Sequence, residues 1–426
     1  MQKVNASIIT IGDELLIGQT IDTNSAWMGQ ELNKIGVWVH RRVAVGDVWD
    51  DIWKALETES KDSDIIFITG GLGPTADDIT KPLLCKFFGG KMIVNENVLK
   101  HVRDIFTKLN RPLLEINLKQ AEVPDVCTVL HNARGTAPGM WFVRKPSKAD
   151  LKKSNKVFIS LPGVPHEMKG LMKNEVLPRL QKEFTLPAII HKTIFTAGQG
   201  ESFIADRIKE FENSLPQNIK LAYLPAYGMV RLRLTSIGEN NSMIEAELLP
   251  YFEKLKVLVK DIMVADEDQG LEIIIGIILK AKGKTMATAE SCTGGYIAHL
   301  ITSVPGSSAY FKGSIVSYAN EVKENLLNVD SDTLKSAGAV SEETVKQMVK
   351  GAIEKLNVDF AIATSGIMGP DGGSLEKPVG TVWIATGNKE KVIAQKLFFR
   401  FDRERNIEMT AQTALNLLRK FILTES

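Results

Sequence analysis

Hydrophobic and polar positions along residues 1–185 alternate between a strand pattern and a helix pattern. The expected strands are SIITIG (7–12), WVHRRVAVG (38–46), DIIFITGG (64–71) and KVFISLPG (156–163). Helical periodicity follows Asp22, runs through Ile52 and Leu56, and covers Ala76 to Phe88. This alternation predicts a doubly wound α/β domain with a mostly parallel sheet. The lysine-rich stretch before KVFISLPG is expected to be a solvated hairpin loop.

The pattern changes after Pro187 and changes back near residue 266. Between these points, the strands KTIFTAG, KLAYLPAY and MVRLRLTSIG alternate with helices at 203–211 and 244–258, which predicts a small α+β domain. Acidic DEDQG (266–270) is expected to be a linker. Strand and helix patterns then resume through MATAE, GSIVSYA, FAIATSG, GTVWIATG and KVIAQKLFF, and a last helix bears Ala411 and Leu418. We predict three domains: 1–185, 186–265 and 266–426.

Composition narrows the class of protein. The 426 residues are 44% hydrophobic and 24% charged, as in globular proteins, and a net charge of +1 gives no reason to expect a nucleic acid or an anionic membrane as partner. The scattered cysteines Cys85, Cys127 and Cys292 exclude a disulfide framework and suit a reducing compartment. The longest apolar run, Ile273 to Leu279, is too short to span a bilayer. We expect a cytoplasmic protein.

A glycine-rich turn, ITGGLGPTADDIT, follows a strong strand of the first domain. Backbone N–H groups at such a turn form a natural phosphate site, and Asp77 and Asp78 are suitably placed to hold a divalent cation. The alternative is structural, because Thr75 with Asp78 three residues later matches a capping box. A second turn, IGDELLIGQTIDTNS, supplies Asp13, Glu14, Asp22 and Asn24. Both turns are expected at the carboxyl edge of a parallel sheet, where ligands bind.

In the last domain, TAESCTGG places three possible nucleophiles, Ser291, Cys292 and Thr293, on a turn between a strand and a helix. The geometry resembles a nucleophile elbow, although a serine at a helix start is most often only an N-cap. His299 is the single histidine of this domain, and its place on the following helix suits a partly exposed or core residue. A Ser-His-Asp triad is therefore poorly supported.

A lysine is the other candidate for a base. Lys323 is expected at the end of the strand that contains GSIVSYA, where a surface charge is the simpler interpretation. To act as a base, its pKa must fall by about three units from ~10.4, which costs about 4 kcal/mol. Burial, or a neighbouring cation such as Arg403, would lower the pKa of Lys323 in this way. A third glycine-rich loop, residues 365–380, is expected to wrap a phosphorylated ligand.

Taken together, the ordered motifs resemble one known family. GDELLIGQTIDTNS, TGGLGPTADDIT, GTAPG, LPGVPHEM, AESCTGG, PGSSAYFKG, EKPVGTVW and DRE resemble the CinA family (competence/damage-inducible protein A) over nearly the whole chain. The resemblance implies an N-terminal domain similar to molybdopterin-binding domains, with metal-dependent (Mg, Mn or Co) ADP-ribose pyrophosphatase activity. It implies a KH-type middle module and a C-terminal nicotinamide mononucleotide deamidase that needs no cofactor.

The resemblance also assigns residues. It implies Ser291 as nucleophile, with Lys323 and Arg403 as its catalytic partners; Phe401 and Ile407 depart from the pattern, so Arg405 stays an alternative to Arg403. The expected substrate-binding residues of the two sites are Cys292, Thr293, Gly294, Tyr318, Ser365, Gly366, Gly372 and Gly373, and Gly70, Gly71, Gly73, Thr75 and Asn24. The expected metal ligands are Asp77, Asp78 and Asp13.

The hypothesis at this point is a bifunctional pyridine-nucleotide salvage enzyme that acts on nicotinamide mononucleotide and ADP-ribose. The middle module lacks the GxxG clamp of nucleic-acid-binding KH domains, since it has Gly198-Gln199-Gly200, so it is expected to be structural or to form a homodimer. One alternative is a molybdopterin-binding or adenylylating protein. The other is a non-enzymatic partner in competence or DNA repair.

Overall fold

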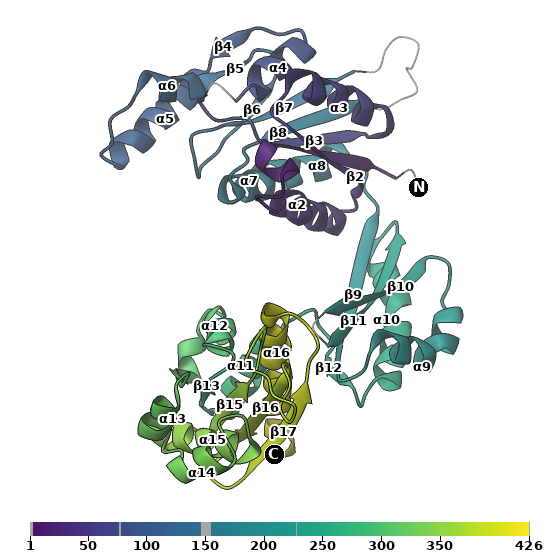
Figure 1. Ribbon diagram of the computed structural model, residues 1–426. Coiled ribbons are helices and arrows are strands. Elements are labelled where there is room, and N and C mark those ends of the chain that lie inside the picture. The colour runs from purple at the N-terminus through teal and green to yellow at the C-terminus, as the bar shows by residue number, and fades with distance from the viewer. Residues whose placement is uncertain (1–2, 76–77, 146–154, 227, 426) are drawn as a thin grey trace. The chain divides into compact units, whose positions relative to one another are not determined.

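The computed structural model describes residues 3–75, 78–145, 155–226 and 228–425. The chain forms two compact units, Met1–Ile190 with Ser236–Glu247, and His191–Thr235 with Leu248–Ser426. Its architecture has three domains: an α/β N-terminal domain, a small α+β middle domain and an α/β C-terminal domain (Figure 1). Within the described residues, no helix is both long and apolar enough to cross a membrane.

The N-terminal domain is built on a six-stranded sheet in the order β2-β1-β3-β8-β7-β6. Strands β2, β1, β3 and β8 are parallel, whereas β7 and β6 continue the sheet in antiparallel pairing. The expected lysine-rich hairpin therefore joins two antiparallel strands, although residues 146–154 lie outside the described part. The strands are β1 (Asn5–Ile11), β2 (Trp38–Val45), β3 (Ile65–Thr69), β6 (Thr128–Leu130), β7 (Gly139–Arg144) and β8 (Lys156–Leu161).

Helices cover both faces of this sheet. Met28, Leu32 and Met168 pack with one face, and Ile52, Leu56 and Leu84 with the other, because strand residues alternate between the two sides. The first face carries α2 (Thr23–Lys34), α7 (Pro165–Leu171), the π-helix η2 (Met172–Val176) and α8 (Leu177–Glu183). The second face carries α3 (Trp49–Asp62) and α4 (Thr80–Phe87), while the single turn α1 (Asp13–Leu16) follows β1.

The helix expected over Ala76 to Phe88 begins at Thr80, so the prediction is wrong for Asp78 and Ile79, while Ala76 and Asp77 lie outside the described residues. Asp78 turns its carboxylate back onto the N–H groups of Gly73 (2.7 Å) and Thr75 (3.0 Å). That contact closes a turn in place of a first helical turn. Thr80 then donates through its N–H to Gly71 O and through its hydroxyl to Gly70 O, which ties the helix start to the turn.

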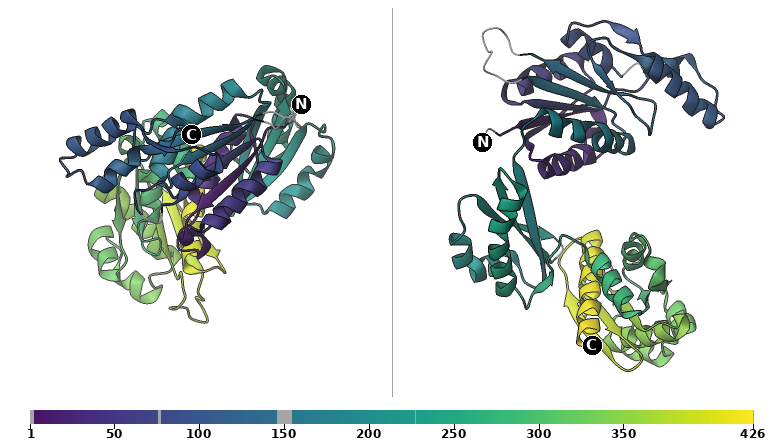
Figure 2. Two further views of the ribbon diagram at one scale, coloured as in Figure 1. Left: turned by 90° about the horizontal axis from the view of Figure 1, so that it is seen from above. Right: turned by 180° about the vertical axis from the view of Figure 1, so that it is seen from behind.

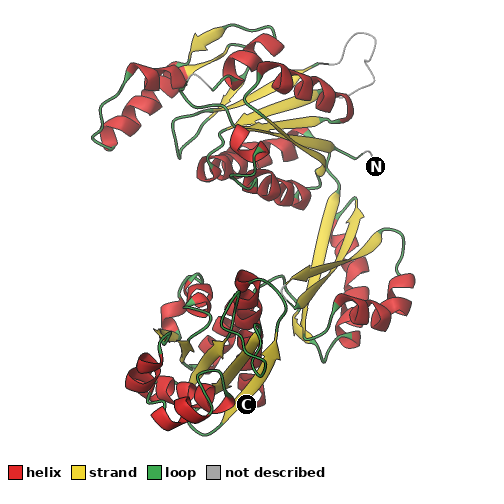
Figure 3. Cartoon of the chain, viewed as in Figure 1, coloured by secondary structure: helices red, strands yellow, loops and turns green. Residues whose placement is uncertain are grey.

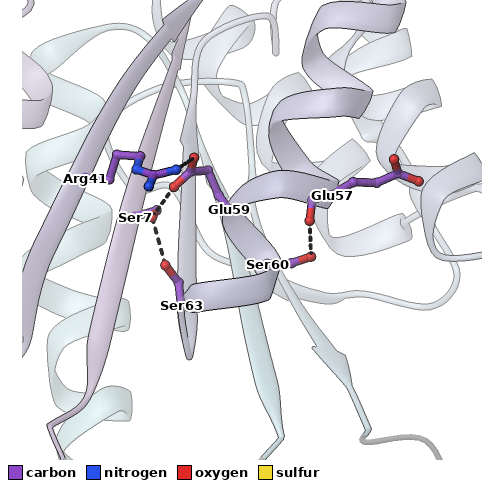
Figure 4. A network of polar contacts seen from close by, with 6 residues as sticks. All are labelled: Ser7, Arg41, Glu57, Glu59, Ser60 and Ser63. Atoms are coloured by element: carbon purple, nitrogen blue, oxygen red, sulfur yellow. Dashed lines mark hydrogen bonds and ion pairs between the residues drawn. The ribbon is translucent and has the colours of Figure 1, made fainter.

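A buried polar network joins α3 to the first two strands (Figure 4). Glu59, almost fully buried, accepts the hydroxyl of Ser7 (2.5 Å) and pairs with Arg41 (3.1 Å). Ser7 also shares a hydrogen bond with Ser63 at 2.8 Å. These groups lie near the amino end of β1, opposite the end that carries the glycine-rich turns, so the network is structural.

Beyond the edge strand β6, a lobe with its own small core projects from the N-terminal sheet (Figure 2). Val98, Val102 and Ala121 form this core. The elements of the lobe are β4 (Met92–Val94), α5 (Glu96–Lys108), α6 (Glu115–Leu118), η1 (Lys119–Ala121) and β5 (Glu122–Pro124).

The middle domain is a four-stranded sheet in the order β10-β11-β9-β12 with two helices (Figure 3). Its elements are β9 (Ala188–Ala197), α9 (Glu201–Asn213), β10 (Ile219–Ala226), β11 (Met229–Gly238), α10 (Asn241–Leu258) and β12 (Met263–Ala265).

The C-terminal domain has a five-stranded sheet in the order β14-β13-β15-β16-β17. Strands β14, β13 and β15 are parallel to one another, whereas β16 pairs antiparallel with β15 and β17 pairs antiparallel with β16. Leu415 and Leu418 of the last helix pack on one face, and Val345 and Met348 on the other. The strands are β13 (Met286–Glu290), β14 (Phe311–Val316), β15 (Phe360–Gly366), β16 (Thr381–Gly387) and β17 (Val392–Phe398). The helices are α11 (Leu271–Lys282), α12 (Tyr296–Thr302), η3 (Ser307–Ala309), α13 (Asn320–Leu327), α14 (Ser331–Ser336), α15 (Glu342–Leu356) and α16 (Arg403–Thr424).

Candidate functional site

The two glycine-rich turns of the N-terminal domain meet at one edge of the sheet. Strands β1 and β3 are parallel neighbours, so Gly12 and Gly70 follow them side by side. A Cβ at Gly70, whose φ is +115°, would overlap the carbonyl oxygen of Ile11, so the close approach requires glycine. The turns line a cavity of about 470 Å³, whose walls include Gly12, Glu14, Gly70, Gly71, Gly73 and Asp78.

Thr75 and Asp78 hold the turn that follows β3 closed. Asp78 accepts from two backbone N–H groups, as described above, and from the hydroxyl of Thr75. The N–H groups of Gly73 and Thr75 therefore donate to the carboxylate of Asp78 in the same turn. In a capping box, the side chain three residues after the cap accepts the backbone N–H of the cap residue. Asp78 and Thr75 make this contact, but the helix begins only at Thr80.

Asn24 fixes the far side of the same cavity. Its side chain is buried, and Nδ2 donates to the carbonyl of Gly163 at 2.7 Å, a residue that lines the cavity. Its Oδ1 is buried and has no hydrogen-bond partner in the described part of the chain. Asn24 itself is not among the lining residues.

Carboxylates line the cavity, but in a different set from the predicted one. Asp13 lies outside the lining and accepts the N–H of Asp47 at 3.3 Å, whereas Glu14, Asp47 and Glu167 join Asp78 in the walls. Asp77 lies outside the described residues. No three metal-binding side chains of the described residues form one group. Scattered carboxylates fit an ion such as Mg²⁺, which proteins commonly hold through one or two carboxylates and the phosphates of a ligand.

Glu167 is a carboxyl group of these walls whose pKa is shifted. Burial raises its pKa, while the amide of Asn132, which donates to Oε2 at 2.6 Å, works in the opposite direction. A carboxyl group with a raised pKa in a cavity suits proton transfer near neutral pH.

The C-terminal candidates gather at the carboxyl edge of the second sheet. Because β13 pairs in parallel with β14 and β15, Ser291, Ser317 and Ser365 end up next to one another at the same level. The N–H of Ser291 donates to the carbonyl of Thr364 at 3.0 Å, which continues the sheet by one residue.

Glu290 organises the turn that carries Ser291. Its side chain is 0% exposed and accepts three backbone N–H groups at the start of α12, those of Gly295 (3.1 Å), Ile297 (3.0 Å) and Ala298 (2.9 Å). It also accepts the hydroxyls of Thr293 (2.8 Å) and Thr288 (3.0 Å). A buried carboxylate thus takes up the positive end of the helix and fixes the turn.

Two N–H groups of this turn are left over. Ser291 O accepts from the N–H of Gly294, whose φ is +60°. Within the described residues, the N–H group of Thr293 has no acceptor and that of Cys292 meets only its own thiol. A pair of adjacent N–H groups without carbonyl partners beside a serine is the arrangement of an oxyanion hole.

Cys292 is a poor nucleophile here. Burial raises the pKa of its thiol to about 12, despite a hydrogen bond with Thr364 and the nearby Lys323 that both favour the thiolate. Hardly any thiolate is therefore present at neutral pH.

Lys323 is neither on a strand nor at the surface, so both parts of its predicted setting are wrong. It lies on helix α13 and is 1% exposed. Its Nζ donates to the carbonyls of Ser317 (2.8 Å) and Tyr318 (3.3 Å), and Ser317 N–H in turn donates to Glu290 O. Burial lowers the pKa of Lys323, while Cys292 acts weakly in the opposite direction. Burial, and not the expected neighbour Arg403, is the cause.

Arg403 reaches the same edge from the start of α16. Its guanidinium donates to the hydroxyl of Tyr318 (3.0 Å) and to Gly369 O (2.7 Å). Arg405 stacks on the ring of Phe401 at 4.3 Å, so Arg403 is the arginine that extends to the candidate site. Tyr318 is 64% exposed, which leaves its ring accessible to a ligand.

The glycine-rich loop begins beside these groups. Ser365 is buried and donates to Ala339 O at 2.7 Å, so its hydroxyl is already engaged. Gly366 packs against Val382, and Gly372 and Gly373 lie farther along the loop, the latter close to Val379.

Several residues of both sites were not predicted from the sequence. Glu290 directly precedes the predicted nucleophile, but the sequence assigned no role to Glu290 or to Thr364. Glu167, in LPGVPHEM, and Asp47 were also missed. Each lies next to a predicted motif in the sequence or in space, but only their contacts reveal what they do.

Comparisons with known proteins agree with this architecture. Family models match residues 7–182 (probable molybdopterin binding domain), 191–263 (damage-inducible protein CinA KH domain) and 268–422 (CinA C-terminal domain). The chain is 46% identical to a CinA-like protein of Flavobacterium psychrophilum, over 99% of both chains, and 45% identical to one of Cytophaga hutchinsonii, over 98% of both. The solved structure of competence/damage inducible protein CihA from Agrobacterium tumefaciens is 39% identical, covers 35% of this chain and 92% of its own, and aligns with a TM-score of 0.35.

Proposed function

Because the chain belongs to the CinA family, we propose that its C-terminal domain hydrolyses nicotinamide mononucleotide to nicotinate mononucleotide and ammonia. The observation that carries the proposal is a buried lysine with a lowered pKa at the same sheet edge as a turn-borne serine. A serine alone is not nucleophilic, whereas a neutral lysine beside it can take its proton.

The chemistry follows from these groups. Ser291 Oγ attacks the carboxamide carbon as Lys323 takes the hydroxyl proton, and the N–H groups of Cys292 and Thr293 bind the oxyanion. The C–N bond then breaks, and Lys323 returns the proton to the departing ammonia. Water, deprotonated by Lys323, attacks the acyl-serine ester; the bond to Ser291 Oγ breaks, Lys323 returns the proton to Oγ, and the nicotinate carboxylate is released. The net reaction consumes one water and releases one ammonia.

The phosphate of the nucleotide is proposed to bind near Arg403. A guanidinium offers paired donors that match phosphate oxygens, and Arg403 is anchored by Gly369 O while its edge reaches Tyr318. Nicotinamide riboside, which lacks the phosphate, should therefore be turned over much more slowly.

The test is product analysis on the purified full chain without added metal. Ammonia and nicotinate mononucleotide should appear in equal amounts from nicotinamide mononucleotide. If a folded protein forms neither product at every pH tested between 6 and 9, the deamidase proposal is refuted.

A second activity is proposed for the N-terminal domain, supported by the cavity of about 470 Å³ at the two glycine turns. Water attacks one phosphorus of ADP-ribose, and the P–O–P bond breaks to give AMP and ribose 5-phosphate. Glu167 is the described carboxyl group best suited to take the proton of that water. A divalent ion held by Asp78 and the neighbouring carboxylates would offset the charge of the phosphates.

Two measurements separate this activity from its rivals. Metal-dependent release of AMP supports the pyrophosphatase, whereas saturable binding of molybdopterin with no ADP-ribose cleavage would support a molybdopterin-binding or adenylylating protein. A protein that turns over neither nucleotide and is required only for DNA uptake or repair would instead be a competence partner.

A further inference from the structure

A second cavity lies on the other side of the wall of the N-terminal site. It has a volume of about 160 Å³ and lies between α5, β6 and the loop of residues 131–138. Its floor is apolar, with Val98, Val129 and Leu130, and its polar groups include His101 and His131. An enclosed cavity of about 150 Å³ is large enough for one benzene ring. This partly open cavity therefore admits one planar ring system.

The two imidazoles form the distinctive part of this cavity. The rings of His101 and His131 lie edge to face, with centroids 4.6 Å apart and planes at 68°. His101 Nε2 faces two carbonyl oxygens, those of Asn132 (2.8 Å) and Gly135 (3.3 Å). Both are acceptors, so Nε2 is the donor in these contacts, and Nδ1 makes no hydrogen bond within the described residues. His131 is exposed and makes no hydrogen bond within the described residues.

The wall between the two cavities is thin and firmly held. Thr136 lines both of them. Asn132, which lines the smaller cavity, is buried and donates to Ala137 O (2.9 Å) and to the Glu167 carboxylate (2.6 Å) of the larger one. Thr136 is therefore the residue that a ligand reaching from one cavity to the other would have to cross.

We propose that this histidine cavity binds the adenine ring of a nucleotide whose phosphates lie at the glycine turns. The inference rests on the proposed N-terminal activity and adds the subsite that selects the base. An apolar floor and an exposed imidazole suit the faces of a purine, since bases bind by stacking on aromatic side chains. His101 Nδ1 offers an acceptor for an exocyclic amino group, which adenine carries as a donor. The terminal ribose then lies on the far side of the phosphates, away from α5.

The probe is AMP, titrated into the full-length protein without metal and followed by saturation-transfer NMR on the adenine protons. His131→Ala should weaken AMP binding roughly 5- to 150-fold, the range expected when one base loses its aromatic partner. The binding of ribose 5-phosphate should not change. Exposed His40 on β2 gives the matched control, His40→Ala, which should bind AMP like the wild type.

His101 needs a conservative variant, because its Nε2 also holds the loop. His101→Gln retains a donor for the two carbonyls and should weaken AMP binding in a protein that is as stable as the wild type. Unchanged AMP binding in both His131→Ala and His101→Gln overturns the inference, as does tighter binding of a pterin than of AMP. If AMP binds as expected but ADP-ribose is not cleaved, the proposed activity fails and the adenine subsite stands.

Discussion

Replacing Glu290 by glutamine tests how the nucleophile turn is held. Oε2 accepts the N–H groups of Gly295 and Ile297 and the Thr293 hydroxyl, while Oε1 accepts the N–H of Ala298 and the Thr288 hydroxyl. An amide has one oxygen and one NH₂ group. The hydroxyls can rotate and accept from that NH₂, but a backbone N–H cannot, so at least one buried N–H loses its acceptor.

The expected loss of stability follows from the number of hydrogen bonds that Glu290→Gln removes or weakens. An unsatisfied buried N–H costs roughly 1–3 kcal/mol, and the remaining bonds lose the contribution of the ionised acceptor, about 1 kcal/mol more. We expect Glu290→Gln to lower the free energy of unfolding of the C-terminal domain by about 2–4 kcal/mol. For a domain of this size the change corresponds to a fall in Tm of roughly 4–16 °C.

A fragment that starts at Glu267 provides the assay. Trp383 is the one tryptophan in that stretch of the sequence, and it pairs with Ser365 at the candidate site. Its fluorescence during urea unfolding therefore reports on this domain alone. Glu354→Gln, at an exposed position of α15, is the matched control and should shift the midpoint little.

The deamidation rate of Glu290→Gln should fall by more than its loss of stability alone explains. A displacement of the turn by about 1 Å can lower the rate roughly 100-fold. If Glu290→Gln unfolds at the same urea concentration as Glu354→Gln, the carboxylate does not hold the start of α12. If it is destabilised but deamidates normally below its unfolding transition, Glu290 supports the fold without setting the position of Ser291.

The remaining predictions concern the two proposed activities. Cys292→Ala should keep most of the deamidation and Ser291→Ala should lose it, since burial suppresses the thiolate; an inactive, folded Cys292→Ala protein would reverse the assignment of the nucleophile. Lys323→Arg should be as inactive as Lys323→Ala, because a guanidinium does not give up its proton; substantial activity would mean that the base lies elsewhere. Burial lowers the pKa of Lys323, so kcat should rise with pH and level off below the range of an ordinary lysine. Stability should rise with pH from the lowered pKa of folded Lys323 up to the pKa of an ordinary lysine, because the unfolded state keeps the proton to higher pH. A flat rate profile would count against a lysine base. Asp78→Asn should abolish ADP-ribose cleavage and leave deamidation nearly unchanged, as measured by steady-state turnover of both substrates, with exposed Asp104→Asn as control; intact cleavage would leave Asp78 only its role in closing the turn.

Local sequence pattern was sufficient for most of the architecture. Strand and helix periods depend on which positions face a core, and they identified the α+β middle domain, the strands of the C-terminal sheet, and β1, β2, β3 and β8 of the N-terminal sheet. The short strand β6 and its neighbour β7 were not predicted. The glycine-rich turns could also be predicted from the sequence, because only glycine tolerates the backbone conformation of Gly70. The starts of helices were harder to predict. Thr80 begins α4 because Asp78 bends back to the turn, a contact that competes with helix formation and has no periodic signal.

The setting of a side chain was decided by tertiary structure alone. The ANEVK sequence reads as a strand end with a surface lysine, but α13 packs against the sheet and buries Lys323. Its lowered pKa results from that burial, which depends on elements more than 30 residues away and is not encoded in any local spacing. The choice of Arg403 over Arg405 has the same origin, since positions two residues apart in the first turn of α16 direct the two guanidinium groups to Tyr318 and Phe401. Sequence thus determined which residue types occur at the ends of which strands, whereas solvation and partners were set by the chain segments that fold over them.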